Sequence, residues 1–289
     1  MRALFIPCYF DGLPRSAGSA RIRAEWVCKY WDQADLFDGT QRIVEYNLIV
    51  FQKVYKGRWA QERIRVAAGR RTLGHPVLLA LDLCDPDFLD RGHARRLQDV
   101  LPLFDFATVP TKALLEWLKW YLPVYQVRDR VDLSEVSGEK EPTENEKPSL
   151  VWFGYSHNAI ALEPMRSEIE RLGLHLTIIA ERMPERWEGV AHFITWGRET
   201  VNGYILNHDV VLNPRRKDTV GRFKSDNKTI HSWAMGMPVA RDVQELREFL
   251  HPRARADEKE RRLAQIQEFD VAQSVKRWKT IYTAWEGKE

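Results

Sequence analysis

The sequence of 289 residues predicts an α/β protein with two doubly wound parallel sheets. Strand-like and helix-like segments alternate along the chain, which is typical of parallel strands joined by crossover helices. A charged stretch, residues 135–148, has few apolar side chains and contains Pro142 and Pro148. Such a stretch is typical of a linker, and it divides the chain into two parts of ordinary domain size.

In the first half, apolar runs predict strands at Ala3–Cys8, Asn47–Phe51, Val77–Leu81, Phe106–Val109 and Val124–Val127. Helices are expected between them, at Ala20–Trp31, Arg58–Arg71 and Thr111–Leu122. These elements predict an N-terminal Rossmann-like domain, residues 1–134.

In the second half, strands are expected at Leu150–Phe153, His175–Ile179, His192–Thr195, Val210–Leu212 and Pro238–Ala240. Helices are expected near Leu162–Leu172, Thr200–Leu206 and Lys228–Met235. Beyond Val243 the pattern is helical to the end, with apolar residues of Val271–Trp285 at helical spacing. We therefore expect a C-terminal domain, residues 149–270, and a helix, residues 271–289, that returns to the N-terminal domain.

Composition excludes several classes of protein. Lys and Arg number 44 against 41 Asp and Glu, a net charge of +3, so the chain has no overall nucleic-acid footprint. Cys8, Cys28 and Cys84 lack paired spacing and are expected to be reduced thiols of a cytoplasmic protein. No apolar run is long enough to span a bilayer, and no signal-peptide, zinc-protease, serine-hydrolase or Walker motif is present.

A basic loop beginning after Pro214 is the most informative segment. Its cations are Arg215, Arg216, Lys217, Arg222, Lys224 and Lys228. Asp226 is expected to cap a short helix that ends at Gly236. A helix N-terminus surrounded by cations favours binding of a phosphate or diphosphate, and a solvated basic loop is the alternative interpretation.

The wording of this segment resembles a known signature. Lys224-Ser225-Asp226-Asn227-Lys228, followed by Gly236-Met237-Pro238-Val239, is similar to the K-S-x-N-K … G-x-P-V signature of sugar-nucleotide glycosyltransferases with the GT-B fold, particularly family four and its bacterial and phage relatives. Two glutamates of that signature are replaced here by Lys224 and His231. Other segments resemble the family in the expected order: Ser19–Arg23, Tyr46–Lys53, Leu81–Asp87, Phe104–Thr111 and Val151–Asn158.

The resemblance implies a GT-B layout with the acceptor on the N-terminal domain and the nucleotide-sugar donor on the C-terminal domain. The donor-binding residues that it implies are Gly18, Tyr155, Ser156, His157, Trp196, Arg215, Arg222, Lys224, Ser225, Asp226, Asn227, Lys228 and His231. Simpler interpretations are a turn glycine for Gly18, packing for Trp196 and a packed helix histidine for His231. Asp82 and Asp85 are candidates for the acceptor's hydroxyl proton, and Arg21 for a phosphate or acceptor contact; helix capping by Asp87 or Asp90 and a surface salt bridge for Arg21 are the alternatives.

Metal and cofactor expectations follow from the same resemblance. Asp85-Pro86-Asp87 matches the D-x-D motif that binds metal and diphosphate in the GT-A fold, but that interpretation leaves the basic loop without a task. We expect no metal and no cofactor, with a nucleoside-diphosphate sugar, such as a UDP-sugar, as co-substrate.

The sequence leaves the acceptor open. A saccharide or small molecule is the first choice, and DNA is the second, since Arg58, Trp59, Arg63, Arg65, Arg70 and Arg71 lie on one predicted helix. Residues 113–122 fit either peripheral contact with a membrane or, preferably, a helix packed between the sheet and the C-terminal helix. A non-catalytic scaffold that binds a nucleotide sugar is the alternative of another class.

Overall fold

The computed structural model describes residues 2–15, 17–75 and 77–286, so residues 287–289 of the predicted C-terminal helix lie outside the described part. The chain divides into two compact units. Unit 1 comprises Met1–Asp132, Phe223–Ser225 and Asp270–Glu289, and unit 2 comprises Leu133–Arg222 and Asp226–Phe269. The domain boundaries drawn from the sequence stay predictions.

Unit 1 is built on a six-stranded sheet of order β2-β1-β3-β4-β5-β6, in which every neighbouring pair is parallel. The strands are β1 (Ala3–Ile6), β2 (Ala34–Leu36), β3 (Leu48–Gln52), β4 (Leu78–Asp82), β5 (Phe106–Val109) and β6 (Val124–Gln126). Most are buried on both faces, which is why they read as continuous apolar runs.

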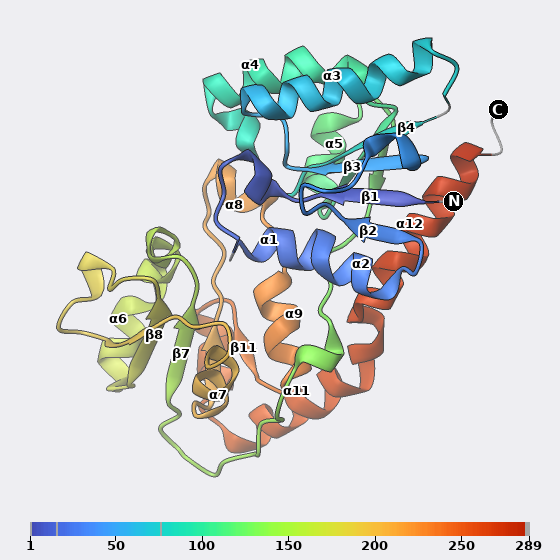
Figure 1. Ribbon diagram of the computed structural model, residues 1–289. Coiled ribbons are helices and arrows are strands. Elements are labelled where there is room, and N and C mark those ends of the chain that lie inside the picture. Colours follow the sequence, from blue (N-terminus) through green and yellow to red (C-terminus); the bar gives the residue numbers. More distant parts are fainter. Residues whose placement is uncertain (1, 16, 76, 287–289) are drawn as a thin grey trace. The chain divides into compact units, whose positions relative to one another are not determined.

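Helices cover both faces of this sheet (Figure 1). One face carries α1 (Gly18–Ala20), a π-helical turn at Arg21–Glu25, α2 (Trp26–Tyr30) and α12 (Val271–Glu286). There the Phe5 ring contacts Trp31 and Trp278 at centroid distances of 6.1 and 5.3 Å. The other face carries α3 (Arg58–Thr72), α4 (Arg91–Val100) and α5 (Lys112–Leu118), whose apolar residues share a core with Leu4 and Ile6.

Unit 2 has a five-stranded parallel sheet of order β11-β10-β7-β8-β9. Its strands are β7 (Leu150–Phe153), β8 (Leu176–Ala180), β9 (His192–Thr195), β10 (Val210–Leu212) and β11 (Val239–Ala240). Its helices are α6 (Glu163–Leu172), α7 (Val201–Leu206), α9 (Asn227–Ala234), α10 (Val243–Glu248) and α11 (Pro252–Gln265), while α8 (Thr219–Phe223) ends in unit 1. Shorter 3₁₀ turns occupy Cys8–Asp11, Ile43–Glu45, Asp87–Leu89, Leu101–Leu103, Leu133–Glu135, Ser156–Leu162, Glu185–Trp187 and Ile266–Phe269.

The predicted fold class, two doubly wound parallel sheets with a terminal helix on the first, is confirmed. Several details differ from the sequence prediction. β2 and α4 were not expected, and the helix expected at Ala20–Trp31 is interrupted by its π-helical turn. The helix expected to continue to Leu122 ends at Leu118, so the Trp120 side chain is left 80% exposed.

The expected packing of α5 against the C-terminal helix is wrong. Leu114 and Leu118 of α5 belong to the core beneath α3 and α4, whereas Trp278 of α12 packs on Phe5 and Phe106 of the opposite face. No helix among the described residues is long and apolar enough to cross a membrane.

Residues 135–148, predicted as a linker, belong to unit 2 and are held there by hydrogen bonds. The carboxylate of Asp209 accepts from the side chains of Thr143, Asn145 and Ser149 at 2.6, 3.3 and 2.9 Å. The guanidinium of Arg255 donates to the carbonyls of Thr143 and Asn145, both at 2.8 Å. Burial alone would raise the pKa of Asp209, but these hydrogen bonds outweigh it and hold that pKa below its ordinary value.

We therefore predict that Asp209→Ala loosens this segment without unfolding unit 2. Endoproteinase Glu-C should cleave after Glu144 or Glu146 faster in the variant than in the wild type, because the hydrogen bonds that fix the backbone are gone. Asp257→Ala, which removes an exposed partner of Arg253, is the matched control and should leave the cleavage rate unchanged. Equal rates for all three proteins would contradict the prediction.

Candidate functional site

Strand order locates the places where ligands bind in sheets of this kind. In unit 1 the order reverses between β1 and β3, and in unit 2 it reverses between β7 and β10. Chain segments leave adjacent strands in opposite directions at such a switch point, which opens a crevice at the carboxyl ends of the strands. The loops after β1, β3, β7 and β10 are therefore the first places to examine.

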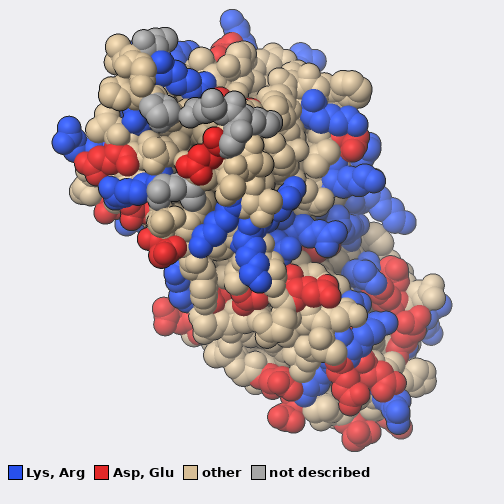
Figure 2. All heavy atoms as spheres, turned by 90° about the vertical axis from the view of Figure 1, so that its right-hand side faces the viewer, with Lys and Arg blue, Asp and Glu red and all other residues tan. Residues whose placement is uncertain are grey.

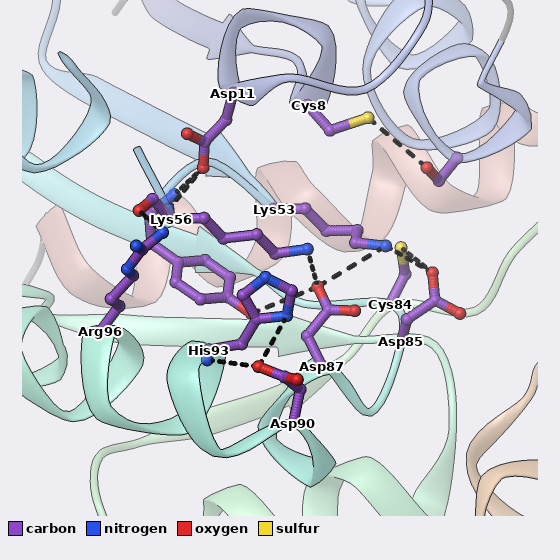
Figure 3. Close-up of polar contacts among 12 residues, drawn as sticks. Cys8, Asp11, Lys53, Lys56, Cys84, Asp85, Asp87, Asp90, His93 and Arg96 are labelled. Carbon is purple, nitrogen blue, oxygen red and sulfur yellow. Dashed lines mark hydrogen bonds and ion pairs between the residues drawn. The ribbon is translucent and has the colours of Figure 1, made fainter. Parts of the chain in front are cut away.

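In unit 1, charged side chains gather after β3 and β4 (Figure 3). Lys53 follows β3, and its Nζ lies 2.6 Å from Oδ2 of Asp85, which follows β4. Lys224 Nζ, from the Phe223–Ser225 segment of unit 1, lies 2.5 Å from Oδ1 of the same carboxylate. Lys56 Nζ lies 2.7 Å from Oδ2 of Asp87. We call Lys53, Lys56, Lys224, Asp85 and Asp87 the edge cluster.

Asp85 is held ionised by this arrangement. Burial alone would raise its pKa, but the ammonium groups of Lys53 and Lys224 outweigh burial and hold the pKa of Asp85 well below its usual range. A carboxylate with a depressed pKa is a weak base but a good hydrogen-bond acceptor. Asp85 therefore suits orientation of a hydroxyl better than removal of its proton.

Lys53 has an unusual backbone. Its φ of 55° lies in the left-handed region, which is rare for a residue other than glycine, Asn or Asp. Strain of this kind persists where the surroundings fix the residue, and here Nζ is held against Asp85 with the side chain only 7% exposed. The strain directs the ammonium group toward the carboxyl edge of the sheet.

Beneath the edge cluster lies a buried ion network centred on Arg23. Its guanidinium makes two hydrogen bonds to Asp82, at 2.5 and 2.7 Å, and one to Asp129 at 2.6 Å. Thr108 Oγ1 donates to Asp82 at 2.5 Å, and Ser225 donates to Asp129. Burial alone would lower the pKa of Arg23, but the two carboxylates outweigh burial and raise it.

This network changes the interpretation of Asp82. Its side chain has no exposed surface, and both oxygens accept hydrogen bonds from Arg23 or Thr108. In this structure Asp82 positions Arg23, and its burial does not favour contact with an acceptor hydroxyl, the role that the sequence suggested. Asp90 is the N-cap of α4, where its carboxylate accepts from the His93 backbone N–H at 2.9 Å, so the capping alternative holds for that residue.

Arg21 and Gly18, the remaining predicted residues near β1, lie in or beside the π-helical turn. The Arg21 guanidinium carbon lies 5.2 Å from the Trp26 ring centroid, within cation–π range. Gly18 begins α1, and no atom lies within 4 Å of the place where a Cβ would stand. Neither residue joins the edge cluster.

In unit 2, Lys228 lies beside the loop that follows β7. Its Nζ is 4.5 Å from the Trp152 ring centroid and 5.8 Å from that of Phe153. A Cβ at position 154 would stand 2.2 Å from this Nζ, and Gly154 has a φ of 148°. Only glycine therefore permits this close approach of the lysine to the end of β7.

The residues after β7 form a second polar group. Ser156 Oγ donates to Glu181 at 2.5 Å, and Arg182 Nε donates to Ser156 Oγ at 3.1 Å. Burial alone would raise the pKa of Glu181, but the hydrogen bonds from Ser156 outweigh it and lower that pKa. The rings of Tyr155 and His157 stack at 5.8 Å, and both side chains are exposed.

Other predicted donor residues have internal partners. His231 Nε2 lies 2.8 Å from Asn202 Oδ1, and its ring meets the Phe153 ring edge to face. Asp226 occupies the N-cap position of α9 without capping it, because its carboxylate pairs with Arg215 instead. Asn227 accepts from the Lys228 backbone N–H at 2.7 Å.

The remaining predicted donor residues are divided between the two units. Trp196 follows β9 and is half-buried, and Arg222 in α8 is exposed. Lys224 and Ser225 belong to unit 1, where they contact Asp85 and Asp129. The roles of the predicted site residues stay predictions.

Three residues at the carboxyl edges of the sheets were not among the site residues predicted from the sequence. Lys53 stands where the resembled strand motif ends in arginine, Asp129 follows β6, and Glu181 follows β8. For Lys53 and Glu181 a signal was available, because each is a charged residue directly after an apolar strand and therefore stands at the carboxyl edge of a sheet.

The arginines of α3, predicted as a grip for nucleic acid, are mostly engaged within unit 1. Arg70 donates to the carbonyls of Ile43 and Val44 at 2.7 and 2.9 Å, and Arg71 pairs with Asp105. The Arg63 guanidinium lies over aromatic rings. In the described part of this helix Arg58 and Arg65 are the exposed arginines, and binding of DNA by the helix stays a prediction.

Comparison with solved structures shows which known fold the chain has. No protein-family model matches the sequence, and no curated protein matches it. The chain is similar to the solved structure of TarM, with 9% identity, a TM-score of 0.57, and coverage of 81% of this chain and 54% of TarM. It is also similar to AviGT4, a glycosyltransferase involved in avilamycin A biosynthesis, with 10% identity, a TM-score of 0.56, and coverage of 98% and 97%. A third similar structure is the trehalose 6-phosphate synthase of Burkholderia multivorans, with 12% identity, a TM-score of 0.53, and coverage of 83% and 72%.

The chain has the GT-B fold. It spans about half the length of TarM and nearly the whole of AviGT4. Among the described residues, no three His, Cys, Asp or Glu side chains come together as a metal site. The carboxyl edge of each sheet is therefore a candidate site within its own unit.

We predict that Arg23→Ala destabilises unit 1 by about 3–5 kcal/mol, because it leaves two buried carboxylates without their cation. Hydrogen exchange of the β4 amides, which reports opening of unit 1, measures the change. Arg58→Ala is the matched control: its salt bridge with Glu62 is exposed and should contribute less than about 1 kcal/mol. A similar small effect for both variants would show that the network does not stabilise the sheet.

Proposed function

We propose that the protein is a GT-B glycosyltransferase that moves a sugar from a nucleoside-diphosphate sugar to a hydroxyl of a saccharide or small molecule, without a metal. Breaking the sugar–phosphate bond places negative charge on the departing diphosphate, and a fixed cation stabilises that charge. Near-complete coverage of AviGT4, a glycosyltransferase, supports this class over the other folds with doubly wound sheets.

The observation that carries the proposal is the position of Lys228. Lys228 lies in the first turn of α9. Its ammonium group lies over Trp152 and against Gly154, beside the switch point of the sheet in unit 2. Positive charge, a helix start and a glycine at the end of the first strand are the features that a diphosphate site needs. Exposed Tyr155 and His157, next along the loop, are suited to contact the rest of the donor.

In unit 1, the edge cluster is proposed to bind the acceptor. Asp85 accepts the hydrogen bond of the acceptor hydroxyl, and Lys53 and Lys224 keep the carboxylate charged and in place. Asp85 then orients the oxygen for attack, and its depressed pKa makes it a weak base. The hydroxyl proton therefore passes to an oxygen of the departing diphosphate as the sugar–phosphate bond breaks.

Lys228→Ala should slow turnover at saturating donor by raising the activation free energy by about 2–4 kcal/mol, since the lost cation would stabilise charge that develops only as the bond breaks. Lys217→Ala is the matched control, an exposed lysine of the same basic loop, and should retain the wild-type rate. The assay measures release of nucleoside diphosphate from a panel of nucleotide sugars, with melting temperature as the check on folding. Equal rates for both variants would remove Lys228 from the site.

The same assay separates an enzyme from a scaffold. Turnover of one nucleotide sugar supports the transferase, whereas binding without turnover across saccharide and small-molecule acceptors supports a non-catalytic scaffold.

Turnover should persist after treatment with a chelator, because lysine and arginine side chains take the place of a metal in the proposed site. Activity that vanished with chelator and returned only with Mg²⁺ or Mn²⁺ would favour a D-x-D site at Asp85 and Asp87 instead.

A further inference from the structure

A basic pocket lies in unit 1 between the end of β6 and helix α12. Its volume is about 400 Å³, and its lining includes the cations Arg128, Arg130, Lys276 and Arg277 and the amides Gln126 and Gln273. Figure 2 views the molecule from the side on which α12 lies in Figure 1, and Lys and Arg side chains gather on this face. β6 is the edge strand, three strands away from β3 in the sheet, so the pocket is separate from the edge cluster.

The pocket concentrates positive charge. None of its lining residues is acidic. Among the residues that the structure describes, Arg128, Lys276 and Arg277 form no ion pair, and all three side chains are exposed. Arg130 is half-buried, and burial together with the charge of Arg128 lowers its pKa, while Asp270 opposes this shift. Adding an anion would relieve this repulsion.

Two of the cations, Arg130 and Arg277, are also held in place. Arg130 Nη1 donates to Ser274 Oγ at 3.0 Å, and the same hydroxyl donates to the Arg128 carbonyl at 3.1 Å. Arg277 Nε donates to the Gln126 carbonyl at 3.4 Å. Gln273, Lys276 and Arg277 lie three and four residues apart on α12 and therefore share one face of it, while Trp278 is buried. Arg130 and Arg277, preorganised in this way, lose little side-chain entropy on binding.

We propose that this pocket binds a soluble small molecule carrying two or more phosphoryl groups, such as an organic diphosphate. Three guanidinium groups match the geometry of phosphoryl oxygens, and the charge of Arg128, Lys276 and Arg277 alone exceeds what one phosphate dianion neutralises. The volume accommodates more than a single phosphate, and the two glutamine amides provide hydrogen bonds to the rest of the ligand. The volume of about 400 Å³ between one strand end and one helix favours a small ligand over a flat membrane or a DNA duplex. This site is independent of the proposed transferase function.

Calorimetric titration with pyrophosphate tests the proposal. It is done in the Lys228→Ala background, so that the candidate donor site in unit 2 does not contribute. We expect saturable binding that Arg128→Gln and Lys276→Gln each weaken by about tenfold or more, the usual effect of losing a charged hydrogen bond. Arg130→Lys should also weaken binding, because the charge remains but the planar fork is lost.

Lys279→Gln is the matched control. Lys279 is an exposed cation on the same helix, 3.7 Å from Asp32, and it does not line the pocket. The Lys279→Gln variant should bind pyrophosphate with the affinity of the background protein, and melting temperatures should show that all variants are folded.

Three results would overturn the proposal. The first is that pyrophosphate does not bind, and the second is that the pocket variants and the control bind it with equal affinity. The third is that the pocket variants keep their affinity for pyrophosphate and lose binding to anionic phospholipid vesicles or duplex DNA instead. Failure of nucleotide-sugar turnover would not affect this result, since the titration needs no donor.

Discussion

The buried guanidinium of Arg23 is the interaction on which the carboxyl edge of the first sheet depends. It joins Asp82 at the end of β4 to Asp129 and the Val127 carbonyl after β6. Two buried carboxylates could not remain charged there without it, and it could not be buried without them. Thr108 and Ser225 supply hydrogen bonds to the two carboxylates, so β4, β5, the end of β6 and the Phe223–Ser225 segment are fixed to one side chain.

This constraint decides which acidic residue is available for chemistry. Asp82 is held within the network and has no exposed surface, whereas Asp85, three residues further on, is partly exposed and pairs with Lys53 and Lys224. Its two lysine partners come from β3's end and from a segment distant in sequence. The sheet thus separates a structural carboxylate from an accessible one within a single short turn.

The fold was largely predictable because its signals are local. β5, β7, β9 and β10 have the predicted bounds, since short apolar runs between polar turns specify buried parallel strands. β2 was missed because its three residues, Ala34-Asp35-Leu36, have a charged residue at the centre and form no apolar run, and α4 because much of Arg91–Val100 is charged or polar. The π-helical turn at Arg21–Glu25 has no local sequence signal. It depends on how the first helix packs in unit 1.

The candidate site was predictable only in part, because its decisive contacts join residues far apart in sequence. The loop after β7 was identified from its position after a strand, but the approach of Lys228 to Gly154 appears only in three dimensions. A side chain at position 154 would meet the ammonium group at 2.2 Å, so the glycine and the lysine constrain one another. Neither residue alone carries the site: the glycine matters because a cation occupies the space beside it, and the cation keeps its place over Trp152 because that space is open.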